Sequence, residues 1–242
     1  MAKVRLDQLV VERGLASSRE KAKALILAGQ VLLDGQKSDK AGREVSEDAH
    51  VELLAQPRFV SRGGLKLEAA LDYWQIDVTG KVGLDVGSST GGFTDCLLQR
   101  GARVVYAFDV GSNQMDWKLR TDPRVVVREG VNARYLQPAD IPEAADLLVA
   151  DVSFISITLI LPAAVALLHP HGELAILVKP QFEVGRGQVG KGGIVRDPAL
   201  HEEAVAKVSH AVQALGFVTD LIDSPILGAE GNKEFLLYGR KQ

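Results

Sequence analysis

The chain has 242 residues, of which 46% are apolar and 24% are charged, and its net charge is −3. This length and composition predict one folded domain of moderate size and a small one, and they exclude a disordered chain or one that binds polyanions over its whole surface. The single cysteine, Cys96, excludes an intramolecular disulfide and a thiolate-based metal site, and the scattered histidines predict no metal site of another kind.

Residues 1–55 have the pattern of a small α+β domain. Apolar spacing predicts a short helix over residues 5–13. We expect Ser17 to cap a second helix, and Glu20, three residues further on, completes the pattern of a capping box. A strand is predicted over residues 30–33, and the following Asp34-Gly35 pair is typical of a tight hairpin turn.

Positive charge gathers in the same segment. Residues 1–43 contain nine Lys or Arg and five Asp or Glu, a local excess of +4. The runs R-L-D-Q-L-V, S-S-R-E-K-A-K-A-L-I and G-Q-V-L-L-D-G-Q resemble the α-L RNA-binding motif of a small-subunit ribosomal protein. The resemblance implies phosphate contacts from Lys3, Arg5, Arg19 and Lys23. The alternative is a small interaction domain whose charges only face solvent.

After a predicted linker over residues 56–62, residues 63–242 alternate between strand and helix patterns. This alternation predicts an α/β domain with a parallel, doubly wound, Rossmann-like sheet. Helices are predicted over 65–74, 92–100 and 198–215, and strands over 82–86, 104–108, 125–127, 147–150, 174–178, 217–222 and 234–238.

A glycine-rich turn follows the first predicted strand of this domain, in D-V-G-S-S-T-G-G-F-T-D. It lacks the second glycine of a dinucleotide-binding loop and the Gly-Lys-Ser/Thr of a P-loop, which disfavours both of those ligands. Asp109, at the end of the next strand, has the position of a carboxylate that binds ribose hydroxyls. The turn is similar to the S-adenosylmethionine loop of methyltransferases that modify ribose. The candidate cofactor-binding residues are Asp85, Gly87, Ser88, Ser89, Gly91, Gly92, Phe93, Asp109, Asn132 and Asp151.

Four charged residues are the catalytic candidates. Asp151 and Lys179 end two apolar strands, where ligands of open α/β sheets bind. Lys66 lies on the helix before the first strand, and Glu234 begins the last strand. A ribose hydroxyl is a weak nucleophile and needs a base, and a lysine becomes a base only when burial or a neighbouring cation lowers its pKa. The sequence leaves open which lysine takes the proton, because the two carboxylates oppose that change.

These four residues resemble the Lys-Asp-Lys-Glu tetrad of FtsJ-type ribose 2'-O-methyltransferases. With the α-L domain, the chain resembles the TlyA (haemolysin A) family in S-R-G-G-L-K-L, A-D-V-S-F-I-S, K-P-Q-F-E and K-G-G-I-V-R-D-P. The resemblance implies methylation of a ribose 2'-hydroxyl, on cytidine, in ribosomal RNA. It also implies S-adenosylmethionine as the cofactor, and ribosomal RNA or ribosomal subunits as the partner.

The stretch from Phe182 to Asp197 contains five glycines and three basic residues. We predict a flexible basic lid that binds RNA with Arg186, Lys191 and Arg196. Arg62, just before the helix predicted over residues 65–74, is a further candidate for RNA binding. The alternative is an ordinary long loop.

Three other functions compete with methyl transfer. A haemolysin-like, membrane-active protein needs an insertion element, and the longest apolar stretch, residues 154–168, is too short to span a bilayer. We therefore expect a cytoplasmic protein without stable membrane association. A non-catalytic RNA-binding assembly factor would not need an intact tetrad. A nicotinamide oxidoreductase would need the missing glycine.

Overall fold

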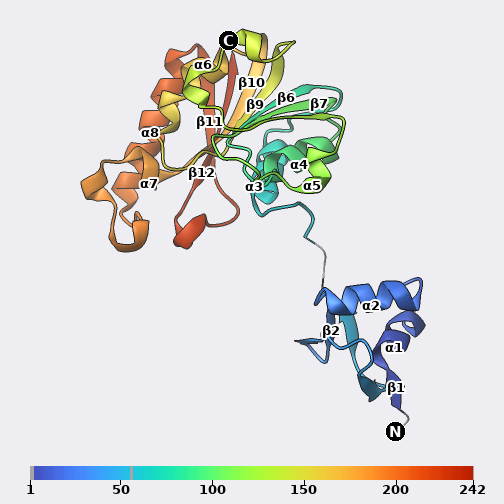
Figure 1. Cartoon of the computed structure of the whole chain (residues 1–242). Coiled ribbons are helices and arrows are strands. Elements are labelled where there is room, and N and C mark those ends of the chain that lie inside the picture. Colours follow the sequence, from blue (N-terminus) through green and yellow to red (C-terminus); the bar gives the residue numbers. More distant parts are fainter. Residues whose placement is uncertain (1–2, 55–56, 242) are drawn as a thin grey trace. The chain divides into compact units, whose positions relative to one another are not determined.

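The computed structural model describes residues 3–54 and 57–241. The chain divides into two compact units, Met1–Pro57 and Arg58–Gln242. In Figure 1 the first unit is blue, and the second runs from cyan through green and yellow to red.

The first unit has two helices and short antiparallel strands within residues 3–54. The elements are β1 (Lys3–Arg5), α1 (Leu6–Glu12), α2 (Arg19–Leu27), β2 (Val31–Leu33), β3 (Gln36–Lys37), β4 (Glu44–Ser46) and β5 (Val51–Leu53). β1 pairs with β4, and β2 lies between β3 and β5. The sequence pattern missed β1 and β4, because three-residue strands offer too little alternation to detect.

The hairpin prediction is confirmed and the helix-cap prediction is wrong. Asp34 and Gly35 have φ angles of 50° and 78°, the left-handed pair that a two-residue hairpin turn requires. The residue that caps α2 is Ser18, whose hydroxyl accepts a hydrogen bond from the backbone N–H of Lys21 at 3.3 Å. Glu20 is therefore one residue too early to complete a capping box.

A compact apolar core joins the helices to the strands of the first unit. Leu6, Val10, Ala22, Ile26 and Val31 are fully buried there. They come from α1, α2 and β2, so this unit has a core of its own.

The second unit alternates strands and helices. Its strands are β6 (Val82–Val86), β7 (Val104–Phe108), β8 (Val125–Arg128), β9 (Ala145–Ala150), β10 (Leu168–Val178), β11 (Phe217–Asp223) and β12 (Phe235–Lys241). Its helices are α3 (Gly63–Tyr73), α4 (Gly92–Gln99), α5 (Trp117–Arg120), α6 (Leu161–Val165), α7 (Pro180–Glu183) and α8 (Pro198–Ala214).

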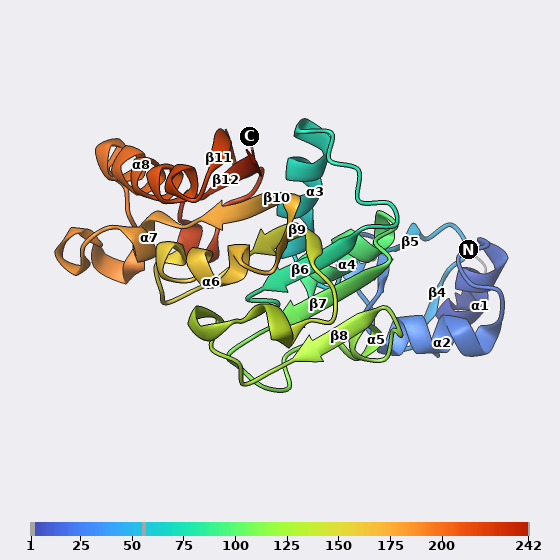
Figure 2. The same ribbon diagram turned by 90° about the horizontal axis from the view of Figure 1, so that it is seen from above.

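Within residues 57–241 the strands form one seven-stranded sheet in the order β11-β12-β10-β9-β6-β7-β8. Figure 2 shows β10, β9, β6, β7 and β8 side by side. The strands from β6 to β10 are parallel, whereas β12 runs antiparallel to both β10 and β11. The sheet is thus mixed rather than wholly parallel, because a loop returns the chain from β11 directly into the neighbouring β12.

Helices cover both faces of the sheet, α3, α4 and α5 on one side and α6 and α8 on the other (Figure 1). Successive side chains of β9 point to opposite faces of the sheet. Leu147 and Val149 pack on the side of α3 and α4, and Leu148 and Ala150 pack on the side of α6 and α8. The order of the strands reverses between β6 and β9, and open α/β sheets bind ligands at such a switch point.

Candidate active site

The glycine-rich turn after β6 is shaped by backbone that other residues cannot adopt. Gly87 and Gly91 have φ angles of 82° and 97°. A Cβ atom at Gly87 would overlap the carbonyl oxygen of Asp151, and one at Gly91 would overlap the side chains of Leu119 and Met115. The turn therefore packs tightly between β9 and α5, and only glycine fits these two positions.

Asp109, directly after β7, holds this turn in place. Its Oδ2 accepts a hydrogen bond from the backbone N–H of Ser89 at 2.8 Å, and its Oδ1 accepts one from Gly111 at 2.7 Å. Each carboxylate oxygen has a second lone pair, so both oxygens can still accept a hydroxyl. Asp109 is thus a fixed, oriented acceptor at the rim of the sheet.

Two adjoining pockets open at the switch point. The first, of about 250 Å³, is lined by Ser61, Arg62, Gly63, Lys66, Gly87, Ser88, Ser89, Thr90, Gly92, Phe93, Asp151, Ser153 and Lys179. The second, of about 290 Å³, is mostly apolar and is lined by Val86, Gly87, Phe108, Asp109, Val110, Val131, Asn132, Ala133, Arg134, Val152, Ser153, Phe154, Ile155 and Ile160. Gly87 and Ser153 line both pockets, so the two form a continuous site.

The cofactor candidates divide between these pockets. Most of the glycine-turn residues and Asp151 line the first pocket, and Asp109 and Asn132 line the second. Asn132 is held by its Oδ1, which accepts hydrogen bonds from the backbone N and the Nε of Arg134, both at 3.2 Å. Asp85 and Gly91 lie behind the lining and support the turn from within the protein.

Asp85 is a fully buried carboxylate under the turn. The Thr94 hydroxyl donates a hydrogen bond to its Oδ2 at 2.6 Å, and its Oδ1 has no partner among the described residues. Burial raises the pKa of Asp85 to about 7, and the Thr94 hydrogen bond opposes that rise. The carboxyl group is therefore partly protonated near neutral pH.

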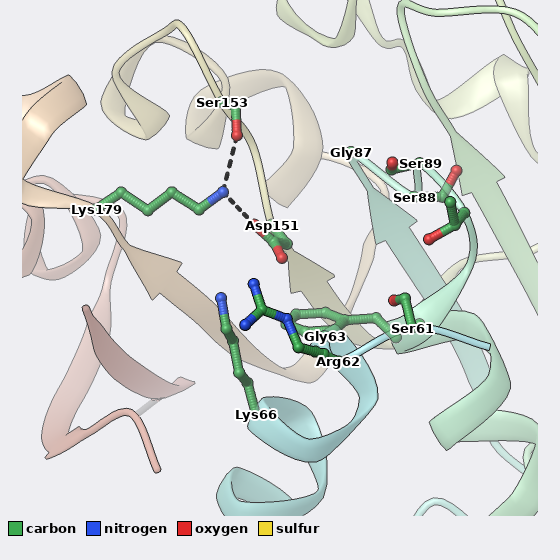
Figure 3. Close-up of a pocket in the computed structure, with 13 residues that line it drawn as sticks. Ser61, Arg62, Gly63, Lys66, Gly87, Ser88, Ser89, Asp151, Ser153 and Lys179 are labelled. Atoms are coloured by element: carbon green, nitrogen blue, oxygen red, sulfur yellow. Dashed lines mark hydrogen bonds and ion pairs between the residues drawn. The ribbon is translucent and has the colours of Figure 1, made fainter. Parts of the chain in front are cut away.

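The four catalytic candidates form two ion pairs. Lys179 Nζ lies 2.5 Å from Asp151 Oδ1, and Lys66 Nζ lies 2.5 Å from Glu234 Oε2. Figure 3 shows Lys179 extending into the first pocket from the left and Lys66 from below, with their amino ends toward Asp151. Parallel β9 and β10 are neighbours in the sheet, which brings Asp151 and Lys179 together at their carboxyl ends.

Glu234, unlike the other three catalytic candidates, does not line the first pocket. Its side chain is 2% exposed and lies behind Lys66 rather than in the pocket lining. A Cβ atom at Gly228 would overlap the Glu234 carboxylate, so the close approach of a glycine makes room for it. Glu234 thus fixes Lys66 from within the protein.

Ser153 belongs to the site although sequence reasoning missed it. Lys179 Nζ donates a hydrogen bond to Ser153 Oγ at 2.9 Å (Figure 3). The available signal was its position two residues after Asp151, on the turn that leaves β9. Ser61 was missed in the same way, and it lines the first pocket from the segment before α3.

That segment lies within the residues that we predicted as a linker. Phe59 is 4% exposed and packs against Gly64 at the start of α3. The backbone N–H of Val60 donates to Asp95 Oδ2 at 2.9 Å, and Arg58 forms an ion pair with Glu68 at 2.6 Å. Residues 58–62 are therefore attached to α3 and α4 of the second unit.

The RNA-binding candidates of the first unit are of two kinds. Lys3 and Lys23 are exposed. Arg5 and Arg19 each form an ion pair with the buried Asp7, at 3.0 and 3.2 Å, while remaining about half exposed. The hydrogen bond from Arg5 lowers the pKa of Asp7 below its ordinary value, although burial opposes this. The two arginines thus have a structural contact besides any contact with RNA.

The basic segment after β10 is anchored at its far end, which limits its use as a freely moving lid. Asn232 Oδ1 accepts a hydrogen bond from Val195 N at 3.0 Å, and its Nδ2 donates to Gly193 O at 2.9 Å. Lys191 and Arg196 are exposed on this segment. The side chain of Arg186 lies outside the described residues, and Arg62 lines the first pocket.

A Rossmann-like sheet has a glycine turn, a strand-end carboxylate and two lysine–carboxylate pairs at its switch point. These features define the class as α/β proteins that bind a nucleotide-type ligand at that point. Residues 59–241 match the family described as FtsJ-like methyltransferase, and residues 4–51 match the S4 domain. The chain belongs to the TlyA (haemolysin A) family of FtsJ-like methyltransferases.

Similar proteins cover nearly the whole chain. YqxC of Bacillus subtilis is 52% identical, with 98% of this chain and 85% of that protein aligned. The 16S/23S rRNA (cytidine-2'-O)-methyltransferase TlyA of Mycobacterium tuberculosis is 46% identical, over 99% of this chain and 91% of that protein. Hemolysin A of Brachyspira hyodysenteriae is 43% identical, over 97% and 99%. A solved structure from Streptococcus thermophilus, 45% identical, covers 100% of this chain and 90% of that one with a TM-score of 0.75.

The comparisons confirm the predicted family, fold class and methyltransferase activity. Among the helices of the described residues, none has the length and apolar character needed to cross a membrane.

Proposed function

We propose that this protein transfers a methyl group from S-adenosylmethionine to a ribose 2'-hydroxyl, on cytidine, in ribosomal RNA. The observation that carries the proposal is the convergence of two lysine–carboxylate pairs on one pocket beside the glycine turn. The Mycobacterium tuberculosis relative, whose name states this substrate, supports the choice of nucleoside.

The residues of the two pockets fit the proposed donor. The apolar second pocket suits an adenine ring, with Asn132 at its edge and Asp109 placed for the ribose hydroxyls. Gly87 and Gly92 line the first pocket with backbone alone, which leaves the backbone of the turn open to the amino-acid end of the donor. When bound, S-adenosylmethionine supplies an electrophilic methyl group on a sulfonium.

The tetrad supplies charge and a base for the acceptor hydroxyl. Lys66 is closed off by Glu234 and is proposed to act as a fixed positive charge beside the acceptor. Lys179 lines the pocket and pairs with the more open Asp151, so it is the group proposed to take the hydroxyl proton, in the neutral form that remains once its ammonium has released a proton to solvent. Proximity of an oriented hydroxyl to the methyl group supplies much of the remaining rate.

Recognition of RNA is assigned to the S4 domain and the basic segment after β10. We propose that Lys3, Arg5, Arg19 and Lys23 contact phosphates, and that Arg62, Arg186, Lys191 and Arg196 hold RNA near the pocket. Such contacts position the substrate rather than read its sequence. Ribosomal RNA or a ribosomal subunit, in the cytoplasm, is the proposed partner.

The test compares ribosomal RNA nucleosides from cells with and without the gene by mass spectrometry. We expect loss of one or more 2'-O-methylcytidines in the deletion strain, and their return with the wild-type gene but not with Lys179→Ala. An unchanged set of 2'-O-methylated nucleosides would refute the proposed function.

Membrane activity is the second candidate, favoured by the name of the Brachyspira hyodysenteriae relative. Purified wild-type protein and Lys179→Ala should be compared for lysis of erythrocytes and for methyl transfer. Lysis that survives the loss of methyl transfer would establish a separate activity, whereas absence of lysis from both proteins rejects it. A non-catalytic assembly role would instead require wild-type protein that binds RNA without transferring methyl groups.

A further inference from the structure

The turn that leaves β9 and the segment that begins at Lys179 are connected at two places. At the near end, Lys179 Nζ contacts Asp151 Oδ1 at 2.5 Å and Ser153 Oγ at 2.9 Å. Lys179 therefore has one ion-pair partner and one hydrogen-bond acceptor, both from the same turn. Two partners restrict a flexible lysine side chain more than one does.

At the far end, Glu183 accepts hydrogen bonds from Ser156 and Ile157 of the turn. It ends α7, four residues after Lys179, and its side chain is 2% exposed. Its Oε1 accepts a hydrogen bond from the backbone N–H of Ile157 at 2.8 Å, and its Oε2 accepts one from the Ser156 hydroxyl at 2.5 Å. Lys207 of α8 pairs with the same carboxylate at 3.1 Å. A buried carboxylate thus fixes the end of the turn that begins at Asp151.

Between the two connections the turn is held in an uncommon conformation. Phe154 has a φ angle of 65°, a left-handed value that a bulky side chain rarely adopts. Its ring contacts that of Phe182 at a centroid distance of 5.3 Å. A backbone conformation of this kind persists where the neighbouring structure imposes it, and here the turn is held on both sides of Phe154, by the Lys179–Ser153 hydrogen bond and by Glu183.

We propose that Ser153 is a positioning residue that holds the amino group of Lys179 for catalysis, and that Glu183 fixes the turn carrying Ser153. The inference rests on the proposed function, because it assigns Lys179 to the acceptor hydroxyl. Asp151 pairs with the lysine by charge, and Ser153, which lines both the first and the second pocket, adds a directional hydrogen bond.

The test uses the full-length protein with S-adenosylmethionine and ribosomal RNA. Ser153→Ala is expected to lower kcat about 10- to 100-fold while KM for RNA and the Kd for S-adenosylmethionine stay within about twofold. Ser153→Thr, which keeps the hydroxyl, is expected to restore kcat to within about threefold of wild type. Ser209→Ala on α8 is the matched control, and we expect wild-type kinetics from it.

Each result separates the inference from the proposed function. Wild-type protein that transfers no methyl group to RNA would refute the function itself. Active wild type with an equally active Ser153→Ala would overturn the positioning role and leave the function standing. A variant that loses donor affinity in calorimetry would make Ser153 a donor-binding residue instead, and failure of Ser153→Thr to restore kcat would also overturn the inference.

Glu183→Gln tests the second part. The amide has nearly the same volume, but it loses the charge that Lys207 and Ser156 face. We expect kcat to fall about three- to tenfold with KM for RNA unchanged, and no change in Glu202→Gln, an exposed neighbour on α8. A Glu183→Gln variant with a lower Tm and a wild-type kcat would show that Glu183 only stabilises the fold and would overturn this part.

Discussion

Lys66 Nζ lies 2.5 Å from Glu234 Oε2, and the two side chains are 9% and 2% exposed, although 168 residues separate them in the chain. The pair connects α3 to the residue just before β12. It removes one lysine of the tetrad from solvent, and it leaves Lys179 and Asp151 as the more open pair. The two lysines therefore have different surroundings in one pocket.

A buried ion pair of this kind should show strong coupling in stability. Glu234→Leu or Lys66→Met alone should lower the free energy of unfolding by about 3–5 kcal/mol, because each leaves a buried charge without its partner. The double variant should recover about 1–3 kcal/mol of the summed loss. Urea unfolding measures all three, with the exposed Glu230→Gln as control. Additive losses would show that the pair contributes nothing as a pair.

Removal of either lysine should stop methyl transfer without removing the donor. For Lys179→Ala and Lys66→Ala we expect kcat to fall about 10²- to 10⁴-fold, since a base or a fixed charge is lost at the acceptor. Calorimetry should show S-adenosylmethionine binding within a few-fold of wild type. Lys241→Ala serves as the control for loss of a positive charge. Abolished donor binding would mean that the lysines belong to the donor site.

Asp109 should control donor affinity. Asp109→Ala removes the acceptor of the Ser89 and Gly111 N–H groups and the proposed partner of the ribose hydroxyls. We expect the Kd for S-adenosylmethionine to rise about 10- to 100-fold. Asp122→Asn, remote from the pocket, should bind the donor normally. If Asp109→Ala binds it equally well, the second pocket is not the adenosine site.

Asp85 should make stability depend on pH near neutrality. Burial raises its pKa from the ordinary 3.8 to about 7. Between these two pH values the carboxyl group is protonated in the folded protein and ionised in the unfolded chain. Its contribution to stability is full below about pH 4 and is lost as the pH rises toward 7. Asp85→Asn should therefore be more stable than wild type at about pH 8, and the difference should shrink toward about pH 5. Thermal unfolding of both proteins across this range measures the effect. A difference that does not vary with pH would contradict it.

Substitutions of Lys23 and Arg19 should both weaken RNA binding, but only the substitution of Arg19 should lower the stability of the first unit. Lys23→Ala is expected to reduce the salt dependence of RNA binding by about one phosphate contact, without changing the stability of the first unit. Arg19→Ala should also lower that stability, because Asp7 loses one of its two arginine partners. Filter binding at several salt concentrations and thermal unfolding give the two readouts. Equal stability of both variants would show that Asp7 does not depend on Arg19.

Local patterns in the sequence were sufficient for much of this protein. Alternation of strands and helices, the glycine turn and Asp109 each depend on neighbouring residues. The turn does follow β6 and Asp109 does follow β7, as predicted, although the sheet is mixed rather than parallel. Asp151 and Lys179 were predictable as neighbours because parallel strands bring their carboxyl ends to one edge. Errors of one residue, as at Ser17, arose because adjacent serines satisfy the same capping pattern and only backbone geometry selects between them.

The sequence by itself determined the family, the order of the longer strands and helices of the second unit, and the residue types of the site. Tertiary structure decided the pairing: Lys66 with Glu234, Arg5 and Arg19 with Asp7, and Lys179 with Ser153. It also decided that β12 enters the sheet antiparallel between β10 and β11. Side-chain partners far apart in the chain are set by how sheets and helices pack, and a hydrogen bond forms only when that packing brings donor and acceptor within about 3 Å. The spacing of residues along the sequence does not give these three-dimensional distances.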